Sequence, residues 1–332
     1  MKRTTAVRTP VAHLVGPGQL KVVNGHLAFK RHGDGPLRLD PTALTDVYCY
    51  GDVAVSGPAM DLLFRHGINT AWFSPAGARC RGRLSRGDAP TTATRMRQHR
   101  AFADPTHRRD WAALVVAGKI DAMTTAARHY QQHGVTLGSL LMDLAALRDQ
   151  LPTAPTTDTL RGLEGAASAL WFRYFASLIA PPWEFPQRSR RPPADPVNAL
   201  LSLGYTWLLN RATAALEARG FEIYLGGLHE YRAGRPSLSC DLIEPLRVPT
   251  VDRWVVSTVG QAELAPNQFV REEGGGYRLQ PAAFGRALYL WEKAWQEGNG
   301  DGILSTWVET LGGFVRERSQ DLRDEPGELA DP

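Results

Sequence analysis

The spacing of apolar residues along this chain changes once, close to residue 87. Before that point they fall in short runs, separated by turn-forming Gly, Pro, Asn and Asp residues, as strands do. After it they recur at the three- and four-residue intervals of amphipathic helices. Strands followed by helices favour an α+β fold. We predict a β-sandwich-like domain over residues 1–87, followed by a larger all-α domain over residues 88–320.

The first domain carries a strong hairpin signal. Asn24-Gly25 separates two apolar runs, and both turn residues tolerate a positive φ angle. A short helix is predicted to begin after Ser56, with Pro58 in its first turn, and to end at Gly67. The predicted strands cover residues 20–23, 26–30, 37–39, 47–50, 53–55, 68–73 and 78–84.

The second domain is predicted to begin after a turn-rich linker at residues 85–90. Its first four helices are expected over residues 110–133, 140–151, 157–179 and 195–220. The remainder is predicted to be mainly helical. The last twelve residues, 321–332, are rich in Asp and Glu and are expected to form a disordered acidic tail.

Composition places the chain among soluble globular proteins, with 43% hydrophobic and 22% charged residues. Its three cysteines are widely separated and form no CxxC pair, which fits a reducing compartment. No apolar run approaches the ~18 residues of a membrane span, and the N-terminus has no signal-peptide core. We therefore expect a cytoplasmic protein without membrane association.

The positive charge is concentrated in one stretch rather than being large in total. The net charge is only +4, but nine arginines lie between Arg79 and Arg109, against Asp88 and Asp104. Such a stripe is typical of proteins that bind a phosphate backbone. The chain has only five Lys among its 38 basic residues, so the arginines also fit a GC-rich genome.

Glu164 lies in the third predicted helix, at the border of its apolar face. Gly165, Ala166 and Ala167 follow it and keep this turn of the helix narrow. A carboxylate that points inward needs a partner, because burying an unpaired charge is costly. That partner is either a divalent metal ion or an arginine such as Arg161 or Arg173, unless the carboxylate stays in solvent.

Three further candidate ligands follow within the next eighty residues. His229 comes directly after a Gly-Gly-Leu sequence and is expected on a loop, where a surface role is also common. Asp241 and Glu244 are three residues apart and share a helix face, although Pro245 disturbs that helix. One imidazole with two or three carboxylates favours Mg²⁺ or Mn²⁺ over a closed zinc site. Arg247, one turn further on, is placed to hold a phosphate or to end the helix in solvent.

Seven segments of the chain form a recognisable succession. They are GDVAVSGPAMDLLFRHGINTAWFSPAGARCRGRL, RMRQHRAFAD, AALVVAGKIDAM, EGAAS, RRPPADPVNALLSLGYTWLLN, GGLH and GRPSLSCDLIEPLR. Together they resemble the CRISPR-associated endonuclease/integrase family, the catalytic subunit of spacer acquisition. The resemblance covers nearly the whole chain, in the order that the family uses, and Arg97, Gln98 and Lys119 stand at positions typical of the family.

The resemblance implies both a fold and a reaction. It implies an N-terminal β-sandwich for homodimerisation and an α-helical catalytic domain. The metal ligands would be Glu164, His229 and Glu244, with Asp241 as a nearby acidic helper. The metal would activate the 3′-hydroxyl of a short prespacer DNA to attack the phosphodiester at the edge of a CRISPR repeat.

The resemblance also implies partners. A small ferredoxin-like CRISPR subunit would bridge two dimers into a heterohexamer. DNA, as prespacer and as leader-repeat target, would be held by arginines, for which we name Arg97, Arg100, Arg190, Arg191 and Arg247. Two alternatives remain at this stage: a metal-dependent nuclease acting on branched DNA or RNA in repair, and a non-catalytic nucleic-acid scaffold.

Overall fold

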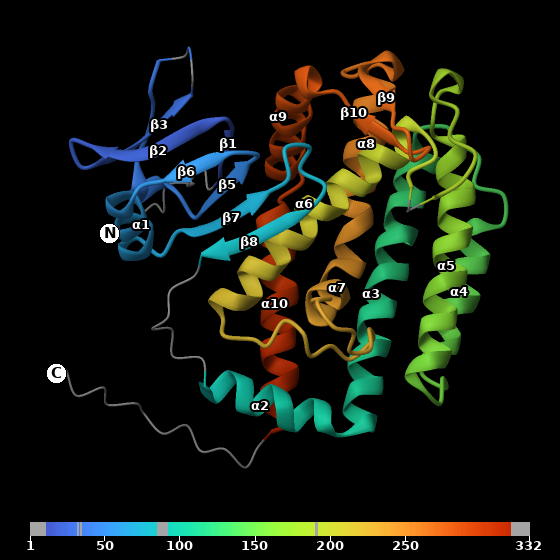
Figure 1. The fold of residues 1–332 in the computed structure, drawn as a ribbon. Coiled ribbons are helices and arrows are strands. Elements are labelled where there is room, and N and C mark those ends of the chain that lie inside the picture. The colour runs from blue at the N-terminus through green and yellow to red at the C-terminus, as the bar shows by residue number, and fades with distance from the viewer. Residues whose placement is uncertain (1–10, 32, 34, 85–91, 190–191, 320–332) are drawn as a thin grey trace, which may run out of the picture. The chain divides into compact units, whose positions relative to one another are not determined.

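A computed structural model describes residues 11–31, 33, 35–84, 92–189 and 192–319 of the chain (Figure 1). By their contacts these residues form two compact units. The first unit contains the N-terminal strands together with residues of 180–210 and 257–292. The second contains the segments 92–179, 211–256 and 293–319. The predicted acidic tail at 321–332, the linker at 85–90 and the pair Arg190 and Arg191 lie outside the described residues.

The N-terminal strands form two four-stranded sheets. In the first sheet, with order β1-β5-β7-β8, β5 pairs in parallel with β1 and β7, and β7 pairs antiparallel with β8. The second sheet has the order β4-β3-β2-β6. Their bounds are β1 Val11–Val15, β2 Gly18–Val23, β3 His26–Arg31, β4 Leu37–Leu39, β5 Asp46–Tyr50, β6 Val53–Val55, β7 Asn69–Phe73 and β8 Cys80–Leu84.

An apolar core lies among these two sheets and helix α1 (Gly57–Arg65). Leu14, Leu20, Leu27 and Val47 are among its fully buried members. The predicted β-rich N-terminal domain is therefore confirmed. The predicted hairpin is also present, because β2 and β3 pair antiparallel across Asn24 and Gly25, whose φ angles are 52° and 78°.

Helices make up most of the remaining chain (Figure 1). Their bounds are α2 Thr92–Ala103, α3 Pro105–Gln132, α4 Leu140–Gln150, α5 Thr157–Ser177, α6 Pro196–Ala218, α7 Ser237–Ile243, α8 Arg253–Gly260, α9 Pro281–Glu297 and α10 Gly300–Glu317. A short antiparallel hairpin, β9 Phe269–Arg271 with β10 Tyr277–Leu279, was not predicted. The predicted α+β class is confirmed. The sequence assigned residues 180–210 and 257–292 to the helical domain, whereas in the structure they belong to the unit of the N-terminal sheets.

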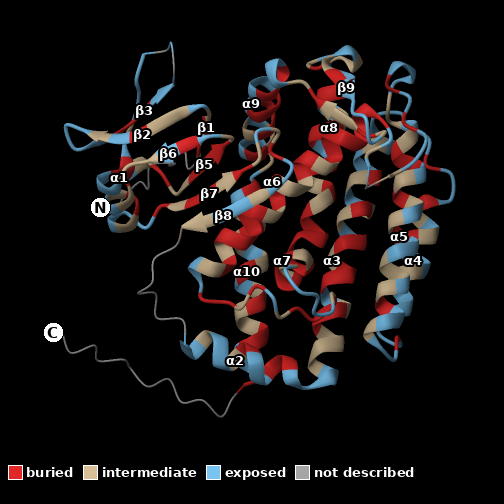
Figure 2. Ribbon diagram, in the orientation of Figure 1, coloured by how far each residue is buried: buried red, intermediate tan, exposed pale blue. Residues whose placement is uncertain are grey.

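The long helix α3 is the centre of the second unit. It packs along α4 and α5 and also contacts α7 and the turn after it. Its apolar side is buried along most of its length (Figure 2), with Trp111, Val115, Ile120 and Met123 almost fully enclosed. Asp104 begins the helix, because its carboxylate accepts a hydrogen bond from the Thr106 amide at 2.7 Å.

The segment after α7 is irregular, as Pro245 predicted. The helix changes to a 3-10 turn at Glu244–Leu246 and then to a π-helical turn at Val248–Asp252. Pro245 and Pro249 lack the amide hydrogen that a regular α-helix would use, so the hydrogen-bond pattern has to shift here. Glu244 therefore lies at the first residue of the irregular segment, next to α3.

Candidate metal centre

The second unit brings Glu164, His229 and Glu244 together at α3. Glu164 comes from α5, His229 from the loop between α6 and α7, and Glu244 from the 3-10 turn. The Glu244 Oε1 atom lies 3.9 Å from His229 Nε2. Between the two carboxylates lies the ammonium group of Lys119, which contacts Glu164 Oε1 and is 2.6 Å from Glu244 Oε2. The three residues proposed from sequence thus form one cluster.

Glu164 is at the edge of the buried region, as its helical position predicted. Its side chain is 20% exposed, and the Ser168 hydroxyl, one turn later, donates a 2.8 Å hydrogen bond to its Oε1. The cation beside it is Lys119, whereas sequence reasoning had suggested Arg161 or Arg173. Arg161 instead pairs with Asp158 and, at 3.1 Å, with Glu230.

His229 is oriented by Asp241. The Asp241 side chain is fully buried, and its Oδ1 lies 2.8 Å from both the backbone nitrogen and the ring Nδ1 of His229. A carboxylate next to Nδ1 favours the tautomer with the proton on that nitrogen, which leaves Nε2 as an electron-pair donor. In this arrangement Nε2 is the atom on the Glu244 side of the ring.

Asp241 also fixes the loop that carries His229. Its Oδ2 accepts hydrogen bonds from the amides of Gly227, at 2.7 Å, and Leu228, at 3.0 Å. A Cβ atom on Gly226 would lie 2.9 Å from Oδ2, so the loop can approach this closely only with glycine there. Both oxygens of Asp241 are therefore used within the protein. It was predicted as an acidic helper in metal binding, and its contacts show a structural role toward His229.

Glu244 is almost completely buried, with 2% of its side chain exposed. Burial alone raises the pKa of its carboxyl, but the charges of Arg247 and Lys119 outweigh this effect and the pKa is lowered to about 2. Arg247 Nη2 lies 2.9 Å from Glu244 Oε1. Arg247 was predicted to contact DNA phosphate, and in the structure it is an ion-pair partner of Glu244.

Lys119 is the feature that sequence reasoning missed. It was noted only for standing at a typical position, yet its side chain is 3% exposed and lies between two carboxylates. A lysine inside the apolar sequence AALVVAGKIDAM is itself a signal, because lysine is almost never fully buried unless it is paired. Within the described part of the chain, no three His, Cys, Asp or Glu side chains surround a common point as metal ligands would.

The other predicted DNA contacts have different environments. Arg100 is exposed on α2, and Arg97 is half-buried and lines a cavity between α2 and α10. None of the described helices is long and apolar enough to cross a membrane.

Comparison with known proteins decides the family. The family model for CRISPR associated protein Cas1 matches residues 13–293. The CRISPR-associated endonuclease Cas1 3 of Thermus thermophilus is 33% identical over 251 residues, which is 75% of this chain and 73% of that protein. The chain belongs to the Cas1 family. The resemblance seen in the sequence is thereby confirmed.

Solved structures share the fold. A Cas1 protein from Thermotoga maritima has a TM-score of 0.80 and 20% identity, covering 93% of this chain and 96% of its own. A casposase bound to integration product has a TM-score of 0.78 and 18% identity, covering 95% and 91%. A chain of a Cas6-RT-Cas1–Cas2 complex has a TM-score of 0.70 and 24% identity, covering 88% of this chain and 35% of that chain.

Close packing next to Lys119 gives a first prediction. A Cβ on Gly118 would overlap the Trp307 ring and lie 3.2 Å from Pro245 Cβ, so Gly118→Ala should push α3 away from the turn that carries Glu244. We expect a loss of about 1–3 kcal/mol in the free energy of unfolding, measured by urea denaturation. Gly162→Ala on α5 is the control, because its added methyl meets nothing within 4 Å. Equal stability of the two variants would contradict the packing argument.

Proposed function

We propose that this Cas1-family chain is a metal-dependent DNA integrase and endonuclease that inserts short prespacer DNA into a CRISPR array. The observation that carries the proposal is the cluster of Glu164, His229 and Glu244, with His229 held in one orientation by Asp241. The relative from Thermus thermophilus is named an endonuclease, and the structurally similar casposase was solved with an integration product. Both names support chemistry on DNA phosphodiesters.

The donor set fits Mg²⁺ or Mn²⁺. Two carboxylates and one imidazole nitrogen are hard to borderline ligands, which suit these ions. The position of Lys119 supports a cation site here, because its ammonium group already places a positive charge between the Glu164 and Glu244 carboxylates. We propose that Glu164, His229 and Glu244 hold the ion and that Lys119 gives up its two contacts when the ion binds. When bound, such an ion supplies Lewis-acid stabilisation of an in-line phosphoryl displacement.

The proposed reaction is a transesterification. The 3′-oxygen of the prespacer forms a new bond to the phosphorus at the edge of the repeat, and the bond from that phosphorus to the 3′-oxygen of the flanking nucleotide breaks, which leaves the prespacer joined to the 5′ end of the repeat strand. The attacking hydroxyl loses its proton, and the departing 3′-oxygen gains one. Repetition on the other strand completes insertion. The protein's part is to orient the ligands and to keep the Glu244 carboxylate ionised, to which Arg247 contributes at 2.9 Å.

We also propose the assembly in which this occurs. One of the structurally similar chains belongs to a complex that contains Cas2, which supports a small ferredoxin-like partner for this chain as well. The proposed unit is a homodimer formed through the N-terminal sheets, with two dimers bridged by the partner into a heterohexamer. DNA is the substrate in both its roles, as prespacer and as leader-repeat target.

The test uses purified protein and partner, a fluorescent prespacer and a supercoiled plasmid that bears a leader and repeat. With Mg²⁺ or Mn²⁺ we expect fluorescent prespacer joined to the plasmid, and EDTA should abolish the product. Glu164→Ala and His229→Ala should each lower strand transfer by at least ~100-fold while DNA binding stays nearly intact.

The outcomes separate the alternatives. Plasmid cutting without joined product would favour a nuclease that acts on DNA intermediates in repair. Tight DNA binding with neither cutting nor joining would favour a non-catalytic scaffold. Full strand transfer by both variants would refute the metal centre.

A further inference from the structure

Arg161 joins helix α5 to the loop that carries His229. Its Nη1 atom donates a 3.0 Å hydrogen bond to the backbone oxygen of Leu228. Its Nη2 atom lies 3.1 Å from the Glu230 carboxylate and also contacts Asp158, three residues earlier on α5. One guanidinium group therefore binds the residues on both sides of His229 and ties them to the helix.

The helix that carries Arg161 also supplies Glu164. The two residues are three positions apart, so they lie on neighbouring parts of one helix face. Glu164 and His229 belong to the same cluster, and the distance between them depends on where the loop sits against α5. A guanidinium group is planar and donates from fixed directions, so it restricts both the distance and the orientation of the loop.

Hydrogen bonds from α7 hold the same loop. Asp241 binds three of its amides and the ring of His229. The Ser237 hydroxyl donates a 2.9 Å hydrogen bond to the backbone oxygen of Glu230. These contacts fix the loop to α7, but they do not set its place against α5. Arg161 provides that second attachment.

The bond to the Leu228 carbonyl is the contact of Arg161 that matters most for position. The Glu230 and Asp158 side chains are 67% and 80% exposed, so water screens both ion pairs and each contributes little. Leu228 itself is buried, and a charge-assisted hydrogen bond to its backbone is stronger than one between neutral groups. Loss of Arg161 should therefore free the loop from α5 without removing any ligand of the proposed metal centre.

We propose that Arg161 is a positioning residue, which holds the His229 loop at a fixed place relative to Glu164. The inference rests on the proposed function in one respect, namely that Glu164 and His229 bind the same metal ion. Arg161 acts through the Leu228 carbonyl and not as a ligand. His229 is then fixed from two directions, its ring by Asp241 and its loop by Arg161.

The test makes two measurements on full-length Arg161→Gln. Hydrogen exchange followed by mass spectrometry, in EDTA, reports whether the loop opens more readily. Titration calorimetry in metal-free buffer reports the affinity for Mn²⁺. We expect the amides of residues 228–230 to exchange roughly tenfold faster, because a hydrogen bond to a charged donor is lost. The Mn²⁺ affinity should fall by about 10–100-fold, as for other groups that orient a metal ligand.

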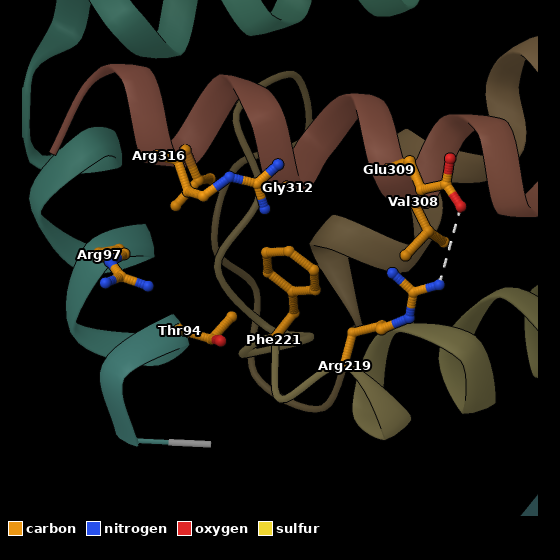
Figure 3. A pocket seen from close by; sticks show the side chains of 9 residues that line it. Thr94, Arg97, Arg219, Phe221, Val308, Glu309, Gly312 and Arg316 are labelled. Carbon is orange, nitrogen blue, oxygen red and sulfur yellow. Dashed lines mark ion pairs between the residues drawn. The ribbon is translucent and has the colours of Figure 1, made fainter. Parts of the chain in front are cut away.

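Two other arginines provide matched controls. Arg173 is exposed on α5, about 18 Å along the helix axis from Arg161. Arg219 lies 3.9 Å from Glu309 of α10, so it also forms an ion pair between two parts of the same unit (Figure 3). Arg173→Gln and Arg219→Gln should leave both the exchange of residues 228–230 and the Mn²⁺ affinity at wild-type values.

Two conservative variants separate the contacts of Arg161. Glu230→Gln removes the exposed ion pair but keeps the bond to Leu228, so the Mn²⁺ affinity should change by less than about threefold. Arg161→Lys keeps the charge, but a lysine ammonium group lacks the planar fork and should restore only part of the lost affinity. Full recovery by Arg161→Lys would mean that charge alone suffices, which would contradict the positioning role.

A general loss of stability would look different. Faster exchange throughout the unit, or weaker Mn²⁺ binding with an unchanged loop, would overturn the proposal. Mn²⁺ bound equally tightly by the wild type and Arg161→Gln would also overturn it, while the metal centre of the proposed function would stand. A wild type that binds no Mn²⁺ would refute that centre, and the exchange of residues 228–230 in Arg161→Gln would then decide on the loop contact by itself.

Discussion

Replacing Lys119 by Met is expected to destabilise the metal-free protein and to strengthen its binding of Mn²⁺. Lys119 is the cation that the Glu164 and Glu244 carboxylates share, at 2.6 Å from Glu244 Oε2. Met fills nearly the same volume without the charge, so the two carboxylates would face each other without the cation between them. Removing one partner of a buried ion pair typically costs about 3–5 kcal/mol.

The expected cost for this site is somewhat lower. Glu164 is 20% exposed and can be partly solvated, and Glu244 keeps Arg247 as a partner at 2.9 Å. We expect a loss of about 2–4 kcal/mol in the free energy of unfolding in EDTA. Differential scanning fluorimetry should show this as a melting temperature lower by roughly 5–10 °C.

The pH dependence of stability should reveal the same interaction between Lys119 and Glu244. In the wild type the pKa of Glu244 is lowered from 4.5 to about 2, so its ionised form stabilises the fold above pH 4.5. That stabilisation is lost as the pH falls from 4.5 toward 2. Lys119→Met removes one of the charges that lower this pKa, so the variant should lose less of its unfolding free energy between about pH 5 and about pH 3.5.

Lys119→Met should lower the stability of the metal-free protein but raise its affinity for a divalent metal ion. A divalent ion at the proposed centre would have to take the two carboxylates from Lys119 in the wild type, but not in the variant. Isothermal titration in metal-free buffer should therefore show tighter Mn²⁺ binding by Lys119→Met, and Mn²⁺ should raise its melting temperature more. Strand transfer is not needed for this readout.

Lys293→Met is the matched control. Lys293 lies on α9 with half of its side chain exposed and is 4.0 Å from Glu297, so the same substitution there should leave stability and Mn²⁺ binding unchanged. If Lys119→Met had the wild-type melting temperature in EDTA, the shared-cation role would be wrong. If it bound Mn²⁺ more weakly than the wild type, Lys119 would be supporting the metal and not competing with it.

Lys119 also shows where sequence reasoning reaches its limit. Glu164 and Glu244 are 45 and 125 residues away from it, and only the packing of α3 against α5 and the Pro245 turn brings them together. Local spacing placed Glu164 at the edge of a buried face, which the structure confirms. Spacing could not choose between a metal and an ion pair, and it suggested the wrong arginines as partners. The family motifs selected Glu164, His229 and Glu244.

For the fold, too, local signals could be predicted from the sequence and long-range packing could not. The hairpin at Asn24-Gly25 and the helices with clear periodicity were predicted because their signals lie within a few residues. The strand β1 was missed because its pairing is parallel to β5, more than thirty residues away. Periodicity showed that residues 180–210 and 257–292 contain helix, but not that these segments pack with the N-terminal sheets.

Asp241→Asn is expected to reduce strand transfer by about 10–100-fold while the protein stays folded. Asn keeps the shape of Asp, but it replaces one acceptor oxygen by an NH₂ group. Each oxygen of Asp241 now faces donors: the His229 amide and ring on one side, and the Gly227 and Leu228 amides on the other. Either orientation of Asn therefore sets a donor against a donor.

The consequence for His229 is specific. Without the carboxylate at Nδ1, the ring loses the partner that keeps its proton on Nδ1 and Nε2 free as an electron-pair donor. Mn²⁺ affinity measured by titration should fall together with strand transfer, whereas DNA affinity should stay close to that of the wild type.

Asp252→Asn is the control, because Asp252 is also buried and accepts a 2.7 Å hydrogen bond from the Trp171 indole, away from His229. It should lower the melting temperature without a comparable loss of Mn²⁺ affinity. If Asp241→Asn and Asp252→Asn lost Mn²⁺ affinity equally, Asp241 would affect metal binding only through the overall stability of the fold. A selective loss in Asp241→Asn would mean that the imidazole must be oriented before the two carboxylates can work with it as one metal centre.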